Sequence, residues 1–381
     1  MPTSFGEKIN EPKILHLNIH GEPATIIVCD PYLFDELSIE LSHFRIDTAM
    51  QEEQGMSIYF QEYRGTFFSK KERIKIRSLK KIRLTCEIEN YSDVANLSTY
   101  LFARKGWNLH EAVILILSQL GYLLRLKLTL KYELAVFHGA SLSYGGQGII
   151  FVGESGAGKT SLSYLCTKQG FRYLSDEDSF VVFEPNRKIF SLLGFQRRMR
   201  INENAVSGFS AFQKLRGQFS GFGEDGIVYD PRINDPDAYC LRAPLKKIII
   251  LYNNVKNEKL TFQKVPAEHR FSQLLKYFES ATTEYGNCRE KIARYNRQGF
   301  GLISHLSQSF EVYSLNYFYQ KHFFALPFKI KAALSSSEIG NALVSSPAVP
   351  RYDVAGIQPP SHREHREEIK TNSWLCSPKK F

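Results

Sequence analysis

The sequence lacks several features that would place the protein in a specialised structural class. Its 6 cysteines are scattered and form no C-x-x-C pair, which argues against a zinc site or a disulfide framework and favours a reducing compartment. Residues 1–12 contain no apolar segment of a secretory signal. The strongly apolar, uncharged stretch at residues 112–124 is too short to span a bilayer and is typical of a buried helix. We therefore expect a cytoplasmic protein with no membrane span.

The overall composition is that of a globular chain. The 381 residues are 43% hydrophobic and 13% aromatic, which is enough for two domains with sizeable cores. The formal net charge is +10, which favours an acidic partner such as nucleic acid, an acidic peptide or nucleotide phosphates. Charge alone does not choose among these partners.

The most specific motif lies within residues 149–165, which read IIFVGESGAGKTSLSYL. The apolar run 149–152 predicts a short buried strand, and residues 161–165 can open a helix. Between them stands a complete G-x-x-x-x-G-K-[ST] motif, in the strand–loop–helix context that a phosphate-binding loop needs. The predicted nucleotide-binding residues are Gly153, Glu154, Ser155, Gly156, Ala157, Gly158, Lys159, Thr160 and Ser161.

This loop predicts binding of ATP with Mg²⁺. Glycines allow backbone N–H groups to turn inward around an anion, and the N-terminus of the following helix adds favourable partial charge. Lys159 is predicted to reach the β- and γ-phosphates, and the hydroxyl of Thr160 to bind Mg²⁺.

Patterning along the chain predicts a small N-terminal α+β domain over residues 1–105. Apolar positions at helical spacing over 32–44 predict a helix. Extended segments are predicted at 13–18, 24–29, 57–61 and 74–89.

A P-loop nucleotide-binding domain is predicted over residues 106–334. Asn108, followed by Glu111, predicts the start of a helix that ends at Leu128. Further strands are predicted at 133–143, 180–183, 245–252 and 310–315, and further helices at 271–278, 289–297 and 318–326. Residues 203–240 are expected to form loops, and the Ser/Pro-rich residues 335–381 a flexible tail.

A basic strip in the N-terminal region permits two interpretations, a solvated outer face or a docking strip for an acidic partner. Aromatic residues are not interleaved with the basic ones as a base-stacking surface requires, so nucleic acid is an unlikely partner. The strip consists of Lys70, Lys71, Arg73, Lys75, Arg77, Lys80, Lys81 and Arg83.

Two further groups flank the phosphate loop. His138-Gly139-Ala140 lies on the strand before the loop strand, and Asp176-Glu177-Asp178 follows the strand after the loop helix. A carboxylate in the second group can hold Mg²⁺, and another can accept a proton from an attacking hydroxyl. Alternatively, His138 has only a structural role and the three acidic residues form a solvated turn.

With these motifs, residues 134–183 resemble the catalytic core of the HPr kinase/phosphorylase family and its wider set of related proteins. The shared pattern is HGA, then G-x-S-G-x-G-K-[ST], then LSDE. The resemblance implies an α/β fold with α+β elements, namely a P-loop kinase core of the HPr kinase and phosphoenolpyruvate carboxykinase type. It also implies a homo-oligomer.

The resemblance implies roles for individual residues. Asp176 matches the aspartate that accepts the proton of a substrate serine, and Glu177 matches the next acidic position, near the metal. His138 matches a histidine near the transferred phosphate. Arg198 and Arg200 lie where relatives carry a basic residue that contacts substrate or phosphate, although surface charge would explain them equally well.

Three departures from the family pattern argue against HPr as the substrate and against the reverse phosphorylase reaction. Ser161 replaces a glutamate, Glu177 replaces the second of two aspartates, and the later glycine-rich signature is absent. We therefore expect a serine kinase for a different protein or peptide. The alternatives are a nucleotide-binding switch with little or no catalysis and, more distantly, chemistry like that of phosphoenolpyruvate carboxykinase.

Overall fold

The computed structural model describes residues 11–46, 55–62, 74–75, 86–92, 97–103, 107–195, 198–202, 226–233, 235–253, 259–280 and 289–335. The chain divides into two compact units, Met1–Ser346 and Pro347–Phe381, and every described residue lies in the first. The predicted tail, apart from Ser335, lies outside the described residues. The basic strip does too, apart from Lys75 and its neighbour Ile74.

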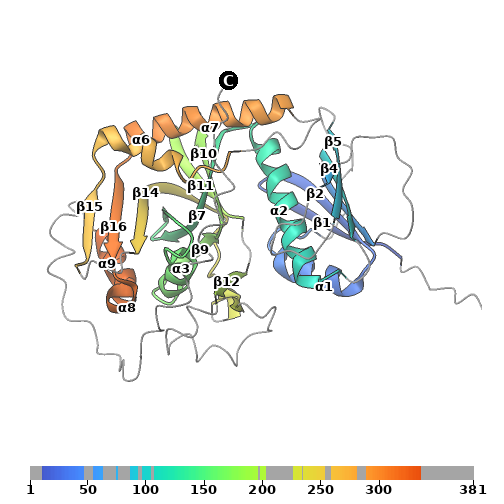
Figure 1. The fold of residues 1–381 in the computed structure, drawn as a ribbon, viewed down its shortest axis with the longest axis horizontal. Coiled ribbons are helices and arrows are strands. Elements are labelled where there is room, and N and C mark those ends of the chain that lie inside the picture. The colour runs from blue at the N-terminus through green and yellow to red at the C-terminus, as the bar shows by residue number, and fades with distance from the viewer. Residues whose placement is uncertain are drawn as a thin grey trace, which may run out of the picture. The chain divides into compact units, whose positions relative to one another are not determined.

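An N-terminal sheet has the strand order β1-β2-β3-β6-β5-β4. Figure 1 labels β1, β2, β4 and β5 of this sheet. Side chains alternate between buried and partly exposed along β1 and β2, as expected where one face of a sheet packs on a core. The elements are β1 (Lys13–Ile19), β2 (Glu22–Val28), α1 (Pro31–Glu40), β3 (Met56–Glu62), β4 (Ile74–Lys75), β5 (Cys86–Ser92) and β6 (Leu97–Ala103). The pattern had not predicted β6, which lies between β3 and β5.

Helix α2 (Leu109–Leu128) follows the sheet and confirms the predicted helix and its cap. The Asn108 side chain accepts a hydrogen bond from the Glu111 N–H at 3.2 Å. The helix is long and apolar enough to cross a membrane, but 67% of its most apolar 18-residue segment is buried inside the protein. Its apolar composition is therefore accounted for by core packing.

A second sheet, with the strand order β11-β10-β7-β8-β14-β16-β15, carries the phosphate loop, and β9 pairs with β7 beside it. Strand β8 pairs in parallel with β14, which pairs in parallel with β16. The strands are β7 (Glu133–Tyr144), β8 (Gln147–Gly153), β9 (Arg172–Ser175), β10 (Asp178–Glu184), β11 (Ile189–Leu193), β14 (Arg242–Asn253), β15 (Thr261–Lys264) and β16 (Val312–Tyr317).

Helices cover both faces of this sheet, so its central strands are apolar on both sides. On one face, Ile149 and Phe151 pack with residues of α3 (Lys159–Thr167) and α9 (Leu326–Ser335). On the other, Ile150 and Val152 pack with residues of α6 (Ala267–Leu275) and α7 (Arg289–Ser309). The fold is mixed α/β and is compatible with nucleotide binding.

Three sequence predictions differ from the structure in this region. Within the segment expected to form loops, β13 (Gly226–Tyr229) pairs with β12 (Met199–Asn202). Helix α7 continues well beyond residue 297. The segment 318–326 is a short helix, α8 (Tyr319–His322), and a 3₁₀ turn that lead into α9. In β13 and in the extension of α7, burial against distant elements overrides a weak local pattern.

One apolar core is shared by the N-terminal sheet, α2 and the second sheet. Leu17 and Ile58 of the first sheet belong to the same buried cluster as Leu120 of α2 and Val136 and Phe180 of the second sheet. The cluster is continuous across residue 105, where composition predicts a domain boundary.

Candidate nucleotide-binding site

The phosphate loop connects the end of β8 to the start of α3, as predicted. Gly158 caps α3 with φ of 88°, a left-handed conformation that glycine adopts without strain. The Ala157 N–H donates to the Glu154 carbonyl at 3.1 Å, and the buried Tyr317 hydroxyl donates to the Ala157 carbonyl. The loop is thus held by its own backbone and by β16.

Lys159 lies at the first position of α3 and turns back over the loop. Its ammonium group donates hydrogen bonds to the carbonyls of Gly153 at 2.7 Å and Glu154 at 3.2 Å, and the residue is only 8% exposed. Burial lowers the pKa of this amine, and nearby carboxylates, first that of Asp176, oppose the shift. A cation is therefore held within the loop.

Asp176 follows β9 directly and is buried beside the loop helix. Burial, together with the charge of Glu177, raises its pKa from 3.8 to about 6, while a hydrogen bond from the Thr160 side chain and the charge of Lys159 act in the opposite direction. The structure therefore brings together Lys159, Thr160 and Asp176, three predicted site residues.

Glu177 occupies the tight turn between β9 and β10 and is exposed. Its φ of 72° is uncommon for a residue other than glycine. Its carbonyl accepts a hydrogen bond from the Gly139 N–H at 3.1 Å. Gly139 leaves no room for a side chain, because a Cβ there would lie 2.6 Å from the Phe151 carbonyl oxygen. The glycine of the HGA motif therefore has a structural role, because it lets β7 lie close to the loop strand β8.

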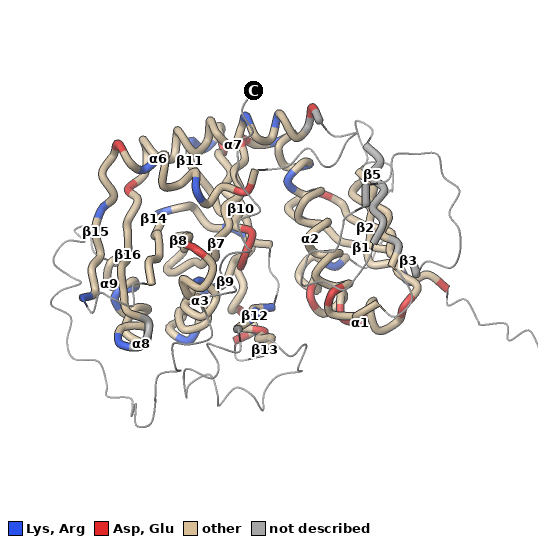
Figure 2. Tube along the Cα trace, in the orientation of Figure 1, with Lys and Arg blue, Asp and Glu red and all other residues tan. Residues whose placement is uncertain are grey.

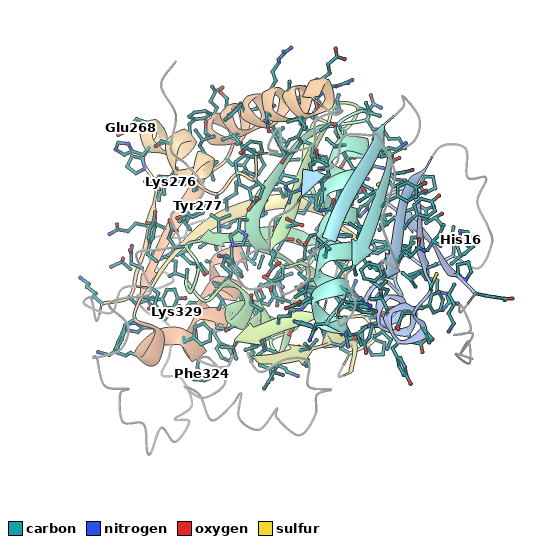
Figure 3. All side chains as sticks on the ribbon, turned by 45° about the vertical axis from the view of Figure 1, so that its right-hand side comes forward. His16, Glu268, Lys276, Tyr277, Phe324 and Lys329 are labelled. Carbon is teal, nitrogen blue, oxygen red and sulfur yellow. The ribbon has the colours of Figure 1, made fainter. Side chains whose placement is uncertain are left out.

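His138 lies on β7 directly opposite Asp178, and its imidazole is 43% exposed. Its Nδ1 is 3.6 Å from a carboxylate oxygen of Glu279. Its backbone N–H donates to the carbonyl of Tyr277, labelled in Figure 3, at 2.7 Å. Sequence reasoning missed Glu279, since it lies in no motif and is far from the loop along the chain.

Arg198 and Arg200 are engaged elsewhere, with the N-terminal helix α1. The Arg198 guanidinium is 2.7 Å from the Glu36 carboxylate and 3.1 Å from that of Glu40. Arg200 is 3.4 Å from Glu40. Figure 2 shows acidic positions on α1 in red and basic positions near β12 in blue. These ion pairs account for both arginines without a ligand.

We expect Glu40→Gln to lower the free energy of unfolding by about 3 kcal/mol. Its side chain is only 1% exposed, and removing its charge leaves two partly buried guanidinium groups without a full counter-charge. Urea denaturation measures the change. The control on the same helix is Asp35→Asn, because Asp35 forms an exposed ion pair with Lys13 and should change stability by less than about 1 kcal/mol. Equal effects of the two substitutions would contradict this expectation.

The donor groups around the loop fit a magnesium–nucleotide complex. Backbone N–H groups, the Lys159 amine and the N-terminus of α3 suit phosphate, while the Thr160 hydroxyl and nearby carboxylates are oxygen ligands of the kind that Mg²⁺ prefers. Within the described residues, no group of three or more His, Cys, Asp or Glu could hold a metal ion. Phosphate oxygens and water would complete its coordination.

Comparisons with known proteins add little to this description. No family model and no curated protein matches the chain. Among solved structures, the HPr(Ser) kinase/phosphatase from Coxiella burnetii is similar over 51% of this chain and 93% of its own, with 12% identity and a TM-score of 0.29. A likeness this weak carries no argument, so the functional conclusion depends on the residues of the site.

Proposed function

We propose that this protein is an ATP- and Mg²⁺-dependent kinase of the P-loop type that transfers the γ-phosphate to a serine hydroxyl of a protein or peptide. The observation that supports it best is the buried Asp176 carboxylate, hydrogen-bonded by Thr160 at the start of the loop helix. In this proposal, Asp176 is a candidate base beside the groups that would hold the phosphates. The region before residue 105 is proposed to capture the substrate.

In this proposal each side chain has one task. The loop N–H groups and Lys159 bind the phosphates, and Lys159 exchanges its loop carbonyls for phosphate oxygens. Thr160 and Glu177 would hold Mg²⁺, which neutralises developing charge when bound. With a pKa of about 6, Asp176 is mostly ionised at neutral pH and can accept the proton of an attacking hydroxyl. His138 lies at the edge of the site, oriented by Glu279.

The second candidate is a nucleotide-dependent switch. It is favoured by the same hydrogen bond, because a carboxylate that binds the Thr160 hydroxyl could also act only as an outer partner of the metal. Such a protein would use ATP to order a partner-binding surface and would transfer no phosphate.

The test is incubation of the purified protein with γ-labelled ATP, Mg²⁺ and a library of serine-containing peptides. The expected result is acid-stable label on serine, which does not form when EDTA is present during the incubation. Nucleotide binding without transfer to any hydroxyl, together with an ATP-dependent change in partner affinity, would favour the switch. Absence of nucleotide binding at millimolar ATP would reject both.

A further inference from the structure

We propose that Arg125 and Asp178 form a positioning pair that holds the acidic turn, residues 176–178, in the geometry that Mg²⁺-dependent nucleotide binding requires. The inference rests on the proposed function of that turn. Arg125 belongs to α2, outside every motif of the nucleotide site, and the pair joins this helix to the first residue of β10.

The pair is short and largely buried. Arg125 Nη2 donates to Asp178 Oδ1 at 2.5 Å, and each side chain is 13% exposed. Asp178 follows Glu177 directly, and in the β10–β7 strand pair it lies opposite His138 of β7. A displacement of Asp178 would therefore move the residue proposed to hold the metal.

Stability alone does not explain this arginine. The residues around it in α2 are apolar and buried, and its Nε has no hydrogen-bond partner among the described residues. Withdrawing two charges from water is unfavourable, and apolar side chains of similar size are often equally stable or better in such places. A buried pair next to a proposed site is more readily explained by a need for fixed geometry.

The turn itself must be held by its surroundings, because Glu177 has a left-handed backbone, which is unfavourable for a residue other than glycine. On its N-terminal side, the Ser175 hydroxyl lies 2.6 Å from that of Ser141 on β7. On its C-terminal side, the Arg125–Asp178 pair is the anchor. The turn is thus held from both ends.

The pair also separates the roles of three consecutive carboxylates. The charge of Lys159 acts on Asp176, and Arg125 forms an ion pair with Asp178. Glu177 is the exposed member of the three. The arrangement keeps Asp178 from competing for the metal ion and reduces repulsion within the turn.

The test separates metal-dependent from metal-independent nucleotide affinity. Calorimetry would give the Kd of a non-hydrolysable ATP analogue, with Mg²⁺ and with EDTA, for the wild type, Arg125→Met, Arg125→Lys and Asp178→Asn. We expect Arg125→Met to keep its Kd in EDTA within about threefold but to lose about tenfold or more of the gain in affinity that Mg²⁺ provides, the usual effect of removing an outer partner of a metal site. Arg125→Lys should recover part of this gain, because it keeps the charge.

The matched control is Arg242→Met. Arg242 forms an ion pair with Glu184 at the opposite end of β10, so its loss removes a charge pair from the same strand without touching the turn. A purely structural role for Arg125 would leave the Mg²⁺ dependence of Arg125→Met equal to that of this control, and this result would overturn the proposal. If Arg125→Met does not fold, an unchanged Mg²⁺ dependence in Asp178→Asn would overturn it equally. A wild type that binds no nucleotide would instead reject the proposed function, and this inference with it.

Discussion

Replacing Lys159 by methionine is expected to weaken ATP binding by about 100-fold or more while leaving the protein folded. The ammonium group is the cation of the loop, and charge-assisted hydrogen bonds to phosphate contribute roughly 1.5–3 kcal/mol each. In the free protein it donates to the carbonyls of Gly153 and Glu154. Methionine is unbranched and only one heavy atom shorter than lysine, so it keeps most of the packing of the side-chain stem.

Titration calorimetry with ATP and Mg²⁺, beside a melting curve without ligand, measures both parts of this expectation. The matched control is Lys168→Ala at the C-terminal end of the same helix, where the amine donates to the Tyr229 hydroxyl at 2.9 Å. This control should bind ATP as the wild type does. ATP binding by Lys159→Met at wild-type affinity would show that the loop does not hold phosphate.

Asp176→Asn is expected to lower phosphoryl transfer by about 10²–10⁴-fold while retaining ATP binding. Asparagine keeps the size of the side chain and can still accept the Thr160 hydrogen bond, but it cannot take a proton from a serine hydroxyl. Transfer of labelled phosphate, measured beside nucleotide affinity, separates the two effects. Transfer at the wild-type rate would remove Asp176 from the mechanism.

The same substitution should also alter the pH dependence of stability in the nucleotide-free and metal-free protein. Because folding raises the pKa of Asp176 from 3.8 to about 6, the folded state binds more protons than the unfolded state between these values. The contribution of Asp176 to stability is therefore favourable in acid and declines as pH rises through this window. Asp176→Asn should be more stable than the wild type by roughly 2–3 kcal/mol at pH 7.5 and by little at pH 4. Urea denaturation at the two pH values measures the difference.

Local patterns predicted the parts of the site whose geometry is set by neighbours in sequence. The strand, loop and helix around Lys159 follow from one continuous motif, and the Asn108 cap follows from two residues. Asp176 lies near the loop because β9, the strand after the loop helix, pairs with β7, which in turn pairs with the loop strand β8.

The partners of the site residues could not be predicted in this way. Arg125 and Asp178 are 53 positions apart, and no spacing rule links an arginine inside an apolar helix to a particular acid. Glu279 meets His138 only because the chain returns to β7 after α6. The position of Arg198 after the acidic motif suggests a contact with substrate, whereas its contacts in the structure depend on where α1 packs.

The apolar core that runs from the N-terminal sheet through α2 to β7 and β10 has a consequence for how the protein unfolds. Removing the first sheet would expose the face of α2 that includes Ile116 and Leu120, and this helix also carries Arg125. The two sheets are therefore expected to melt in one cooperative transition, with the slowest hydrogen exchange in α2 and the strands that contact it. Destabilising the first sheet would then reduce the fraction of molecules that have an intact nucleotide site, although the sheet and the site are far apart in sequence.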